Sequence, residues 1–477
     1  MLFNSIDFAV FLPLAFLVHW LLLRNQRARN VFLLLASYVF YGWWDPRFLS
    51  LLALSSFIDF WVSTGLGKET RASRRKALLL MSLTANLGML GFFKYHDFFV
   101  SNVEAAFSFF GQPLRLRHLD LILPVGISFY TFQTLSYTID VYKGRLKPSD
   151  DMLSFMAYVS FFPQLVAGPI ERATHLLPQF SKPRTFSSMQ AVDGLRQMLW
   201  GLVKKMVVAD NCAPYVDSVF SAPEAVGGST LLVGAILFSI QIYCDFSGYS
   251  DVAIGCARLF GFDLMRNFAY PYFSRDIAEF WRRWHISLSS WFRDYVYVPL
   301  GGSRNGIGAT LRNTLIIFLL SGFWHGANWT FVCWGAIHAL LFLPLLLAKR
   351  NRKHMEVVAH NRFLPTPKEA LSMLGTYLAT VLAWVFFRAE DVSSAVTHIG
   401  GIFSSTLFSL PSVRPADVAI MISALIAVEW LGRRHQHPLH LLDRLRWRPL
   451  RWAVYYGLIA LIISFAGAEQ EFIYFQF

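Results

Sequence analysis

Residues 319–329 read LLSGFWHGANW and place a histidine, His325, inside sequence that is apolar enough for a membrane. An ionisable imidazole is costly to bury in an apolar segment, so it needs either a compensating hydrogen bond or a chemical task. The Gly326-Ala327-Asn328 break after it predicts that the apolar run 313–347, too long for a single span, forms two. This stretch therefore indicates a helical membrane protein and makes the chain a candidate membrane enzyme.

Composition supports a polytopic membrane protein. Of the 477 residues, 55% are hydrophobic and only 15% are charged, whereas soluble domains contain about 25% charged residues. Besides 313–347, apolar windows occur at 6–23, 31–44, 48–66, 77–95, 119–142, 152–167, 230–243, 370–387, 416–431 and 452–466. They predict an all-α protein with roughly ten to twelve transmembrane helices. The short windows 152–167 and 230–243 are expected to be tilted or re-entrant, and further helices to lie at the interface.

The distribution of charge predicts which loops lie in the cytosol. The net charge is +13, and basic residues gather in short loops such as 24–29 and 68–76. Because positively charged loops stay inside, both loops and the basic stretch 266–312 are expected in the cytosol, with the N-terminus extracytoplasmic. The pair Lys204-Lys205 is interpreted as an anchor at the cytosolic interface. The first window has no basic n-region or cleavage site and is predicted to be retained as a span. Without a basic soluble module, nucleic-acid binding is not expected.

Other catalytic and metal signatures are weak. Cys212, Cys244, Cys256 and Cys333 lack the spacing of a metal site and are expected to be small buried residues, so no metal is predicted. The sequence contains no GxSxG elbow, P-loop or HExxH motif. Histidine is therefore the main catalytic resource that the sequence offers an enzyme.

The stretch 280–295, FWRRWHISLSSWFRDY, carries an aromatic stripe and a second histidine. Read as one helix, it repeats its apolar side chains at helical spacing, as Trp281, Trp284, Leu288, Trp291 and Tyr295. Off that stripe lie Arg282, Arg283 and Arg293. The pattern is typical of a helix that lies at the membrane interface or dips into a protein-lined cavity. An interfacial anchor would not require His285.

The two histidines suggest separate roles. A neutral imidazole with a pKa of about 6.5 can take a proton from a hydroxyl that attacks an acyl carbon, and desolvation keeps it neutral. His325, next to Trp324, is the better candidate for this base, and His285 for an orienting or donor contact. The structural alternative for His325 is a core histidine bonded to a backbone carbonyl or to Asn328. A purely structural role for His285 is equally open.

A second polar cluster, QIYCDFSGYSD at 241–251, interrupts apolar sequence. At membrane depth, Asp245 and Asp251 need partners. Pairing with an arginine, such as Arg258 or Arg275, is favoured over direct catalysis. The two carboxylates are therefore expected to shape a cavity.

These motifs resemble the membrane-bound O-acyltransferase (MBOAT) superfamily, and within it the bacterial alginate O-acetyltransferase branch. The resemblance rests on EFWRRWHISLS at 279–289, RDYVYVPLGG at 293–302 and GFWHGANW at 322–329. It extends over essentially the whole chain, to SYVFYGWW at 37–44, AGPI at 167–170 and FIYFQF at 472–477.

The resemblance implies one membrane domain over residues 1–477, with a catalytic core near 119–347 and spans around a central passage. By position, His325 matches the family's catalytic histidine and His285 its second signature position. In such proteins a cytosolic thioester donor and an extracytoplasmic acceptor meet at the histidine, and no cofactor is tightly bound. The donor-side or cavity candidates are then Trp281, Arg282, Arg283, Trp284, Arg293, Trp324, Asn328, Asp245 and Asp251.

The resemblance also implies O-acetylation of an exported, alginate-like polysaccharide by a multi-pass protein of the bacterial inner membrane. Acetyl-CoA or another acyl thioester is the expected donor, and the basic stretch with Arg282, Arg283, Arg293 and Arg304 suits its anionic part. A periplasmic acetyltransferase partner is expected to pass the acetyl group on. O-acetylation of peptidoglycan or cellulose and D-alanyl transfer to teichoic acid are alternatives. A proton-coupled transporter is the alternative from a different class.

Overall fold

The computed structural model describes residues 1–166, 168–465, 470 and 472–473, and these form helices and loops without a strand. Predicted features that fall on Ala167, on residue 466 or on residues 474–477 lie outside the described residues. The chain forms two compact units, the first comprising Met1–Gln190 and Ala257–Leu264, and the second Ala191–Cys256 and Met265–Phe477. The all-α class is confirmed. The single domain with a core near 119–347 stays a prediction.

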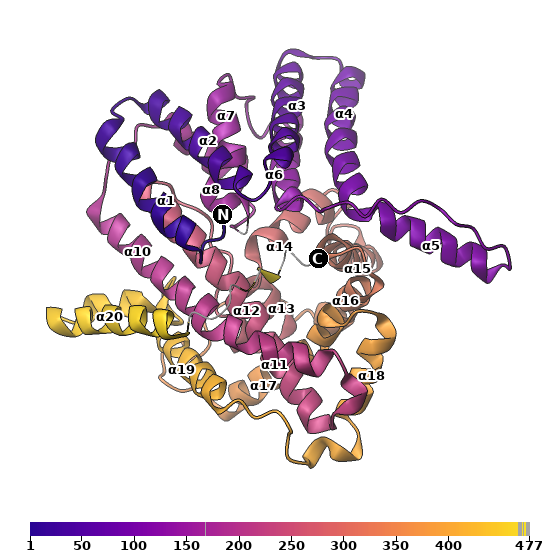
Figure 1. Ribbon diagram of the computed structural model, residues 1–477. Coiled ribbons are helices and arrows are strands. Elements are labelled where there is room, and N and C mark those ends of the chain that lie inside the picture. Colours follow the sequence, from indigo (N-terminus) through magenta and orange to yellow (C-terminus); the bar gives the residue numbers. More distant parts are fainter. Residues whose placement is uncertain (167, 466–469, 471, 474–477) are drawn as a thin grey trace. The chain divides into compact units, whose positions relative to one another are not determined.

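The first unit contains the N-terminal helices shown in indigo and violet in Figure 1. They are α1 (Ile6–Leu17, extended by a π-helical turn, Val18–Leu22), α2 (Gln26–Gly42), α3 (Leu49–Lys68), α4 (Ala72–Leu90), α5 (His96–Phe109), α6 (Ile127–Tyr142), α7 (Met152–Ser160), α8 (Phe162–Leu165) and α9 (Ala173–Ser181). Side-chain caps define where the first two begin: Ser5 accepts from the backbone N–H of Phe8, and Asn25 accepts from that of Arg27.

A fully buried carboxylate joins three helices of this unit. Asp59 on α3 accepts hydrogen bonds from Asn86 of α4 at 2.8 Å, from Thr138 of α6 at 2.8 Å, and from Ser82. In a membrane segment an unpaired carboxylate is costly, and these donors satisfy it. Sequence reasoning did not single out this network.

The second unit contains the remaining helices. They are α10 (Ser188–Leu202), a π-helical segment (Val203–Ala209), α11 (Asp210–Phe220), α12 (Gly228–Leu259, whose last residues belong to the first unit), α13 (Ile277–Arg283), α14 (Ile286–Phe292), a second π-helical segment (Arg293–Tyr297), α15 (Gly306–His325), α16 (Trp329–Leu347), α17 (Pro367–Arg388), α18 (Val392–Ile402), α19 (Ala416–Gly432) and α20 (Arg448–Phe465). An apolar core joins α11, α12, α17 and α18 through side chains such as Val219, Leu231, Val381 and Ala395.

The predicted break after His325 is confirmed. Helix α15 ends at His325, and α16 begins at Trp329 and packs against it (Figure 1). Gly322 and Gly335 make this contact possible, because a Cβ atom at Gly322 would overlap the carbonyl oxygen of Phe331, and one at Gly335 that of Phe318. Close backbone approach between small residues is a common way to pack helices in membranes.

Among the residues that the structure describes, six helical stretches are long and apolar enough to cross a membrane: Pro46–Lys68, Ala72–Phe109, Gly228–Leu259, Gly306–His325, Trp329–Leu347 and Pro367–Arg388. The prediction of a short segment at 230–243 is wrong, because α12 continues for 32 residues through the polar cluster. The window 119–142 is helical only from Ile127. The total of ten to twelve crossings stays a prediction.

Candidate active site

The stretch 280–295 is not the single amphipathic helix that its periodicity predicts. It is divided into α13, α14 and a π-helical segment, and His285 lies at the break with φ 44° and ψ 54°, in the left-handed region. Non-glycine residues rarely adopt this conformation, and it persists only where surrounding contacts hold it. Trp284, before it, is extended. The apolar stripe therefore faces the protein interior instead of a membrane interface, and Trp281, Trp284, Leu288 and Trp291 are all buried.

Asn267 supplies the contacts that hold the break. Its side-chain oxygen lies 3.1 Å from Nδ1 of His285 and accepts from the hydroxyl of Ser287 at 2.9 Å. Its backbone carbonyl accepts from the N–H of Ile286 at 2.9 Å, and its amide nitrogen donates to Ser250 at 3.1 Å. No sequence pattern pointed to Asn267, because its role depends on a backbone conformation formed 18 residues further along the chain.

The structure brings the two candidate histidines together. The ring centroids of His285 and His325 are 6.3 Å apart, and the two residues are 0% and 3% exposed. The prediction that His285 lies among arginines at an interface is wrong. Burial lowers the pKa of the His285 imidazole to about 3, so this ring is neutral at physiological pH.

Aromatic side chains surround the histidine pair. Phe246 of α12 meets His285 edge-on at 4.7 Å between centroids, and Trp324 lies 6.0 Å from the same ring. Trp334 and Phe387 contact His325 at 5.1 and 5.3 Å. Two further predicted tryptophans form an outer layer of aromatic contacts: Trp281 packs on Trp334 at 5.6 Å, and Trp284 packs on Trp384 at 4.9 Å. Such an environment keeps water from the imidazoles and strengthens any polar interaction formed there.

Asn328 has a structural role. Its side-chain oxygen caps α16 by accepting from the N–H of Thr330 at 3.0 Å, and its amide donates to the carbonyl of Glu390 at 2.7 Å. Both ends of the amide are thus engaged away from His325. The alternative in which His325 is a core histidine that hydrogen-bonds to Asn328 therefore loses its support.

The predicted arginine cluster is divided between structural and exposed positions. Arg282 donates to the backbone carbonyls of Asn351 and His354 at 2.7 and 2.8 Å. Arg283 forms an ion pair with buried Glu279 at 2.9 Å. The Arg282 bonds anchor α13 to the loop before α17, whereas the Arg283 ion pair lies within α13. Both arginines are engaged inside the protein, which corrects the expectation that they are available to an anionic donor. Arg293 remains 63% exposed beside Asp294, and Arg304 is exposed.

The two aspartates of α12 pair with lysines. Asp245 lies 2.8 Å from Lys205, and Asp251 lies 2.5 Å from Lys204, so the predicted partners Arg258 and Arg275 are wrong. The interpretation of Lys204-Lys205 as an interface anchor is also wrong, because both side chains are 3% exposed. Adjacent residues of a π-helical segment point in different directions, and each lysine meets a different carboxylate. The sequence did offer a signal for these ion pairs: two adjacent lysines in apolar sequence, in a chain that also places two aspartates at membrane depth.

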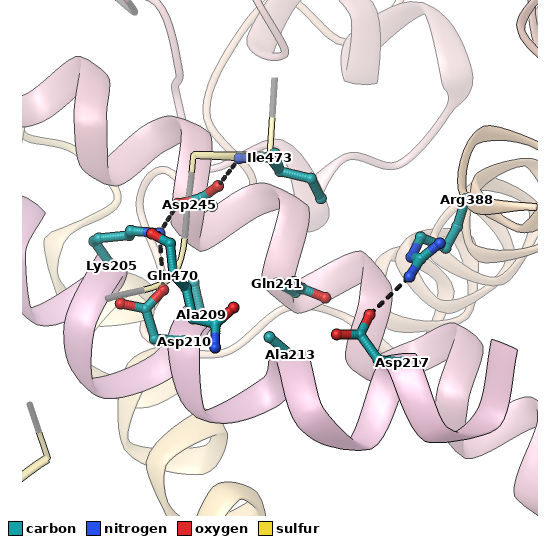
Figure 2. A pocket seen from close by; sticks show the side chains of 10 residues that line it. All are labelled: Lys205, Ala209, Asp210, Ala213, Asp217, Gln241, Asp245, Arg388, Gln470 and Ile473. Carbon is teal, nitrogen blue, oxygen red and sulfur yellow. Dashed lines mark hydrogen bonds and ion pairs between the residues drawn. The ribbon is translucent and has the colours of Figure 1, made fainter. Parts of the chain in front are cut away.

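A polar pocket of the second unit is lined by charged side chains of the π-helical segment, α11 and α12 (Figure 2). Its lining consists of Lys205, Ala209, Asp210, Ala213, Asp217, Gln241, Asp245, Arg388, Gln470 and Ile473. Two of these residues directly adjoin the aromatic frame: Asp245 precedes Phe246, and Arg388 follows Phe387. Arg388 forms an ion pair with Asp217 at 2.7 Å.

Comparison with known proteins identifies the class of this protein. The family model described as the membrane-bound O-acyltransferase family matches residues 149–386. A probable alginate O-acetylase of Pseudomonas putida is 38% identical over 442 residues, covering 91% of this chain and 88% of the relative. A probable alginate O-acetylase of Pseudomonas aeruginosa is 39% identical, covering 91% and 82%. A peptidoglycan O-acetyltransferase of Helicobacter pylori is 32% identical, covering 100% and 98%.

The chain belongs to the membrane-bound O-acyltransferase family. It is a multi-pass membrane enzyme of the acyltransferase class.

Proposed function

We propose that this protein transfers acetyl groups from a cytosolic thioester, through the membrane, for the O-acetylation of an exported, alginate-like polysaccharide. The observation that carries the proposal is the buried His285–His325 pair, enclosed by aromatic side chains in a chain of this family. The relatives named for alginate match most of this chain, which favours such an acceptor over peptidoglycan, although the peptidoglycan relative also matches throughout.

His325 is proposed as the general base. An acceptor hydroxyl attacks the thioester carbonyl carbon while His325 takes the hydroxyl proton. Collapse of the tetrahedral intermediate then breaks the carbon–sulfur bond, the proton passes to the leaving thiolate, and an acetyl ester and a free thiol result. His285, neutral and held by Asn267, would orient the reacting group between the two rings.

Acetyl-CoA is the proposed donor. Coenzyme A is too polar to cross a bilayer, so the reacting ends must meet within the protein. Arg293 and Arg304 retain the exposure that an anionic donor requires, whereas Arg282 and Arg283 are engaged internally. We place the protein in the bacterial inner membrane with an extracytoplasmic N-terminus, and propose that a periplasmic acetyltransferase delivers the group to the polymer.

The test is release of free CoA from acetyl-CoA by the detergent-purified protein, followed with a thiol reagent. His325→Ala is expected to abolish release while leaving expression and elution unchanged. His19→Phe is the matched control, since His19 is also fully buried between aromatic rings but belongs to the first unit. Retained turnover in His325→Ala would sink the proposal, and solute flux in vesicles without thioester turnover would favour the transporter.

A further inference from the structure

Lys205 is the centre of a buried ion-pair cluster that the reaction itself does not require. Its ammonium nitrogen lies 2.8 Å from a carboxylate oxygen of Asp210 and 2.8 Å from one of Asp245 (Figure 2). The lysine side chain is 3% exposed. Burying three charges is costly, and retaining them calls for a specific task.

The same cluster binds the C-terminal segment, defined as the described residues Gln470, Phe472 and Ile473. The backbone N–H of Ile473 donates to the second carboxylate oxygen of Asp245 at 2.7 Å, and Lys205 donates to the carbonyl oxygen of Gln470 at 3.2 Å (Figure 2). Both bonds join a charged side chain to the main chain. Lys205 and Asp245 therefore hold Gln470 and Ile473 through their main-chain atoms.

This segment reaches the histidine pair through one aromatic contact. Phe472 is fully buried, with its ring centroid 4.4 Å from that of Tyr249 and 5.8 Å from that of Phe246. Phe246 in turn meets His285 at 4.7 Å. Gln470 and Ile473 also line the polar pocket.

We infer that Lys205 and Asp245 are positioning residues, which hold the C-terminal segment of Gln470, Phe472 and Ile473 against Phe246 and thereby fix His285 for catalysis. The catalytic part of this inference rests on the proposed function, whereas the anchoring of the segment does not. A displacement of about 1 Å at a reacting group can cost on the order of 10²-fold in rate. Loss of the cluster should therefore reduce kcat and leave KM for the donor unchanged.

The neighbouring ion pair provides a matched control. Lys204 is as buried as Lys205, and it pairs at 2.5 Å with Asp251, which lies on α12 like Asp245. Lys204 also donates to the hydroxyl of Ser247 at 2.9 Å. Within the described part of the chain, the bonds of Lys204 do not involve Gln470, Phe472 or Ile473. Asp251→Ala therefore removes a carboxylate partner from a buried lysine, as Asp245→Ala does, but it removes no bond to these three residues.

The experiment measures anchoring and catalysis separately in the full-length protein. Gln470→Cys, in a Cys333→Ala background, reports access of a maleimide to the segment, because Gln470 uses its backbone oxygen for binding. Asp245→Ala should speed labelling by about tenfold or more, the factor expected for loss of one hydrogen bond to a charged group. It should also lower kcat for CoA release by on the order of 10²-fold at constant KM. Asp251→Ala should leave labelling at the wild-type rate.

Further variants keep the inference falsifiable. Lys205→Arg retains a cation that can bridge both carboxylates, and it should preserve slow labelling and most of kcat. Should Asp245→Ala fail to fold, Asp245→Asn, which lacks the charge but keeps the shape, takes its place. Unchanged labelling would show that the cluster does not anchor the segment, and faster labelling with unchanged kcat would show that anchoring does not position His285. If the wild-type protein releases no CoA, the proposed function fails, while the labelling rates still decide the anchoring.

Discussion

Replacing Asn267 by alanine tests whether the left-handed backbone at His285 is part of the active site. Asn267 is fully buried. Its side-chain oxygen is the acceptor for the N–H of Ser287 at 3.4 Å and for the hydroxyl of Ser287. The facing Nδ1 of His285, at 3.1 Å, must then carry its proton, which leaves Nε2 as the acceptor nitrogen of the neutral ring. The amide therefore sets both the conformation and the tautomer of His285.

The magnitude follows from the bonds that Asn267→Ala removes. The change removes four side-chain bonds, to Nδ1 of His285, to the Ser250 hydroxyl, and to the N–H and the hydroxyl of Ser287. Loss of the bonds to His285 and Ser250 alone deprives two buried polar groups of a partner, at about 1–3 kcal/mol each. Together they give about 2–6 kcal/mol of lost stability by the same rule. In addition, His285 is free to leave its strained conformation. Because that movement displaces a reacting ring, kcat for CoA release should fall on the order of 10²-fold.

The assay combines a thermal unfolding midpoint in detergent with the rate of CoA release at a temperature where the variant is folded. Asn30→Ala is the control, since Asn30 is a buried asparagine of the first unit that bonds Ser154 and the carbonyl of Phe180. It should lower the unfolding midpoint without a comparable fall in kcat. A folded Asn267→Ala protein that turns over at the wild-type rate would refute the reasoning.

Three other perturbations have distinct expected outcomes. Gly322→Leu should prevent α15 from packing against α16, because its side chain would overlap the Phe331 carbonyl, so the purified yield should collapse; Gly375→Ala, in open space, should be neutral in the same expression test. Asp59→Ala strands three buried donors and should lower the unfolding midpoint more than Asp59→Asn, at about 1–3 kcal/mol per unsatisfied group. Burial lowers the pKa of His285 to about 3, below the ordinary value of about 6.5 that applies in the unfolded chain. On acidification the unfolded chain therefore binds a proton on His285 before the folded protein does. The stability that neutral His285 contributes is complete above about pH 6.5 and is lost as pH falls towards 3. Between these two pH values, His285→Gln should reduce the pH dependence of the free energy of unfolding by up to about 1.4 kcal/mol per pH unit. A pH dependence equal to that of the wild-type protein would contradict this.

Local patterns were sufficient for much of the architecture. The composition and the apolar windows predicted an α-helical membrane protein, and the break after His325 appears where Gly326 and Asn328 predicted it. Helix ends and apolar runs depend on neighbouring residues, so sequence carries them directly. The prediction of one amphipathic helix over 280–295 was wrong. The period of the apolar side chains describes their spacing, but it contains no information about the left-handed backbone at His285, which is held by Asn267.

Charged partners were the least predictable part of the site. Arginine is the usual partner for a buried carboxylate, yet Lys205 reaches Asp245 because a π-helical segment turns it inward. Arg282, which seemed available to a ligand, donates instead to backbone carbonyls around 351–354. Such pairings depend on the direction of side chains from elements that are distant in the chain.

By itself, the sequence determined that the protein is helical, that it resides in a membrane and that it resembles the O-acyltransferases to which it belongs, and it predicted His285 and His325 as the catalytic candidates. Only the tertiary structure decided that these histidines lie 6.3 Å apart in one aromatic enclosure, and that Lys205 and Asp245 bind the main chain of Gln470 and Ile473. The physical reason is that hydropathy and helical period are local properties. The proximity of residues 285, 325 and 473 depends instead on how whole helices pack.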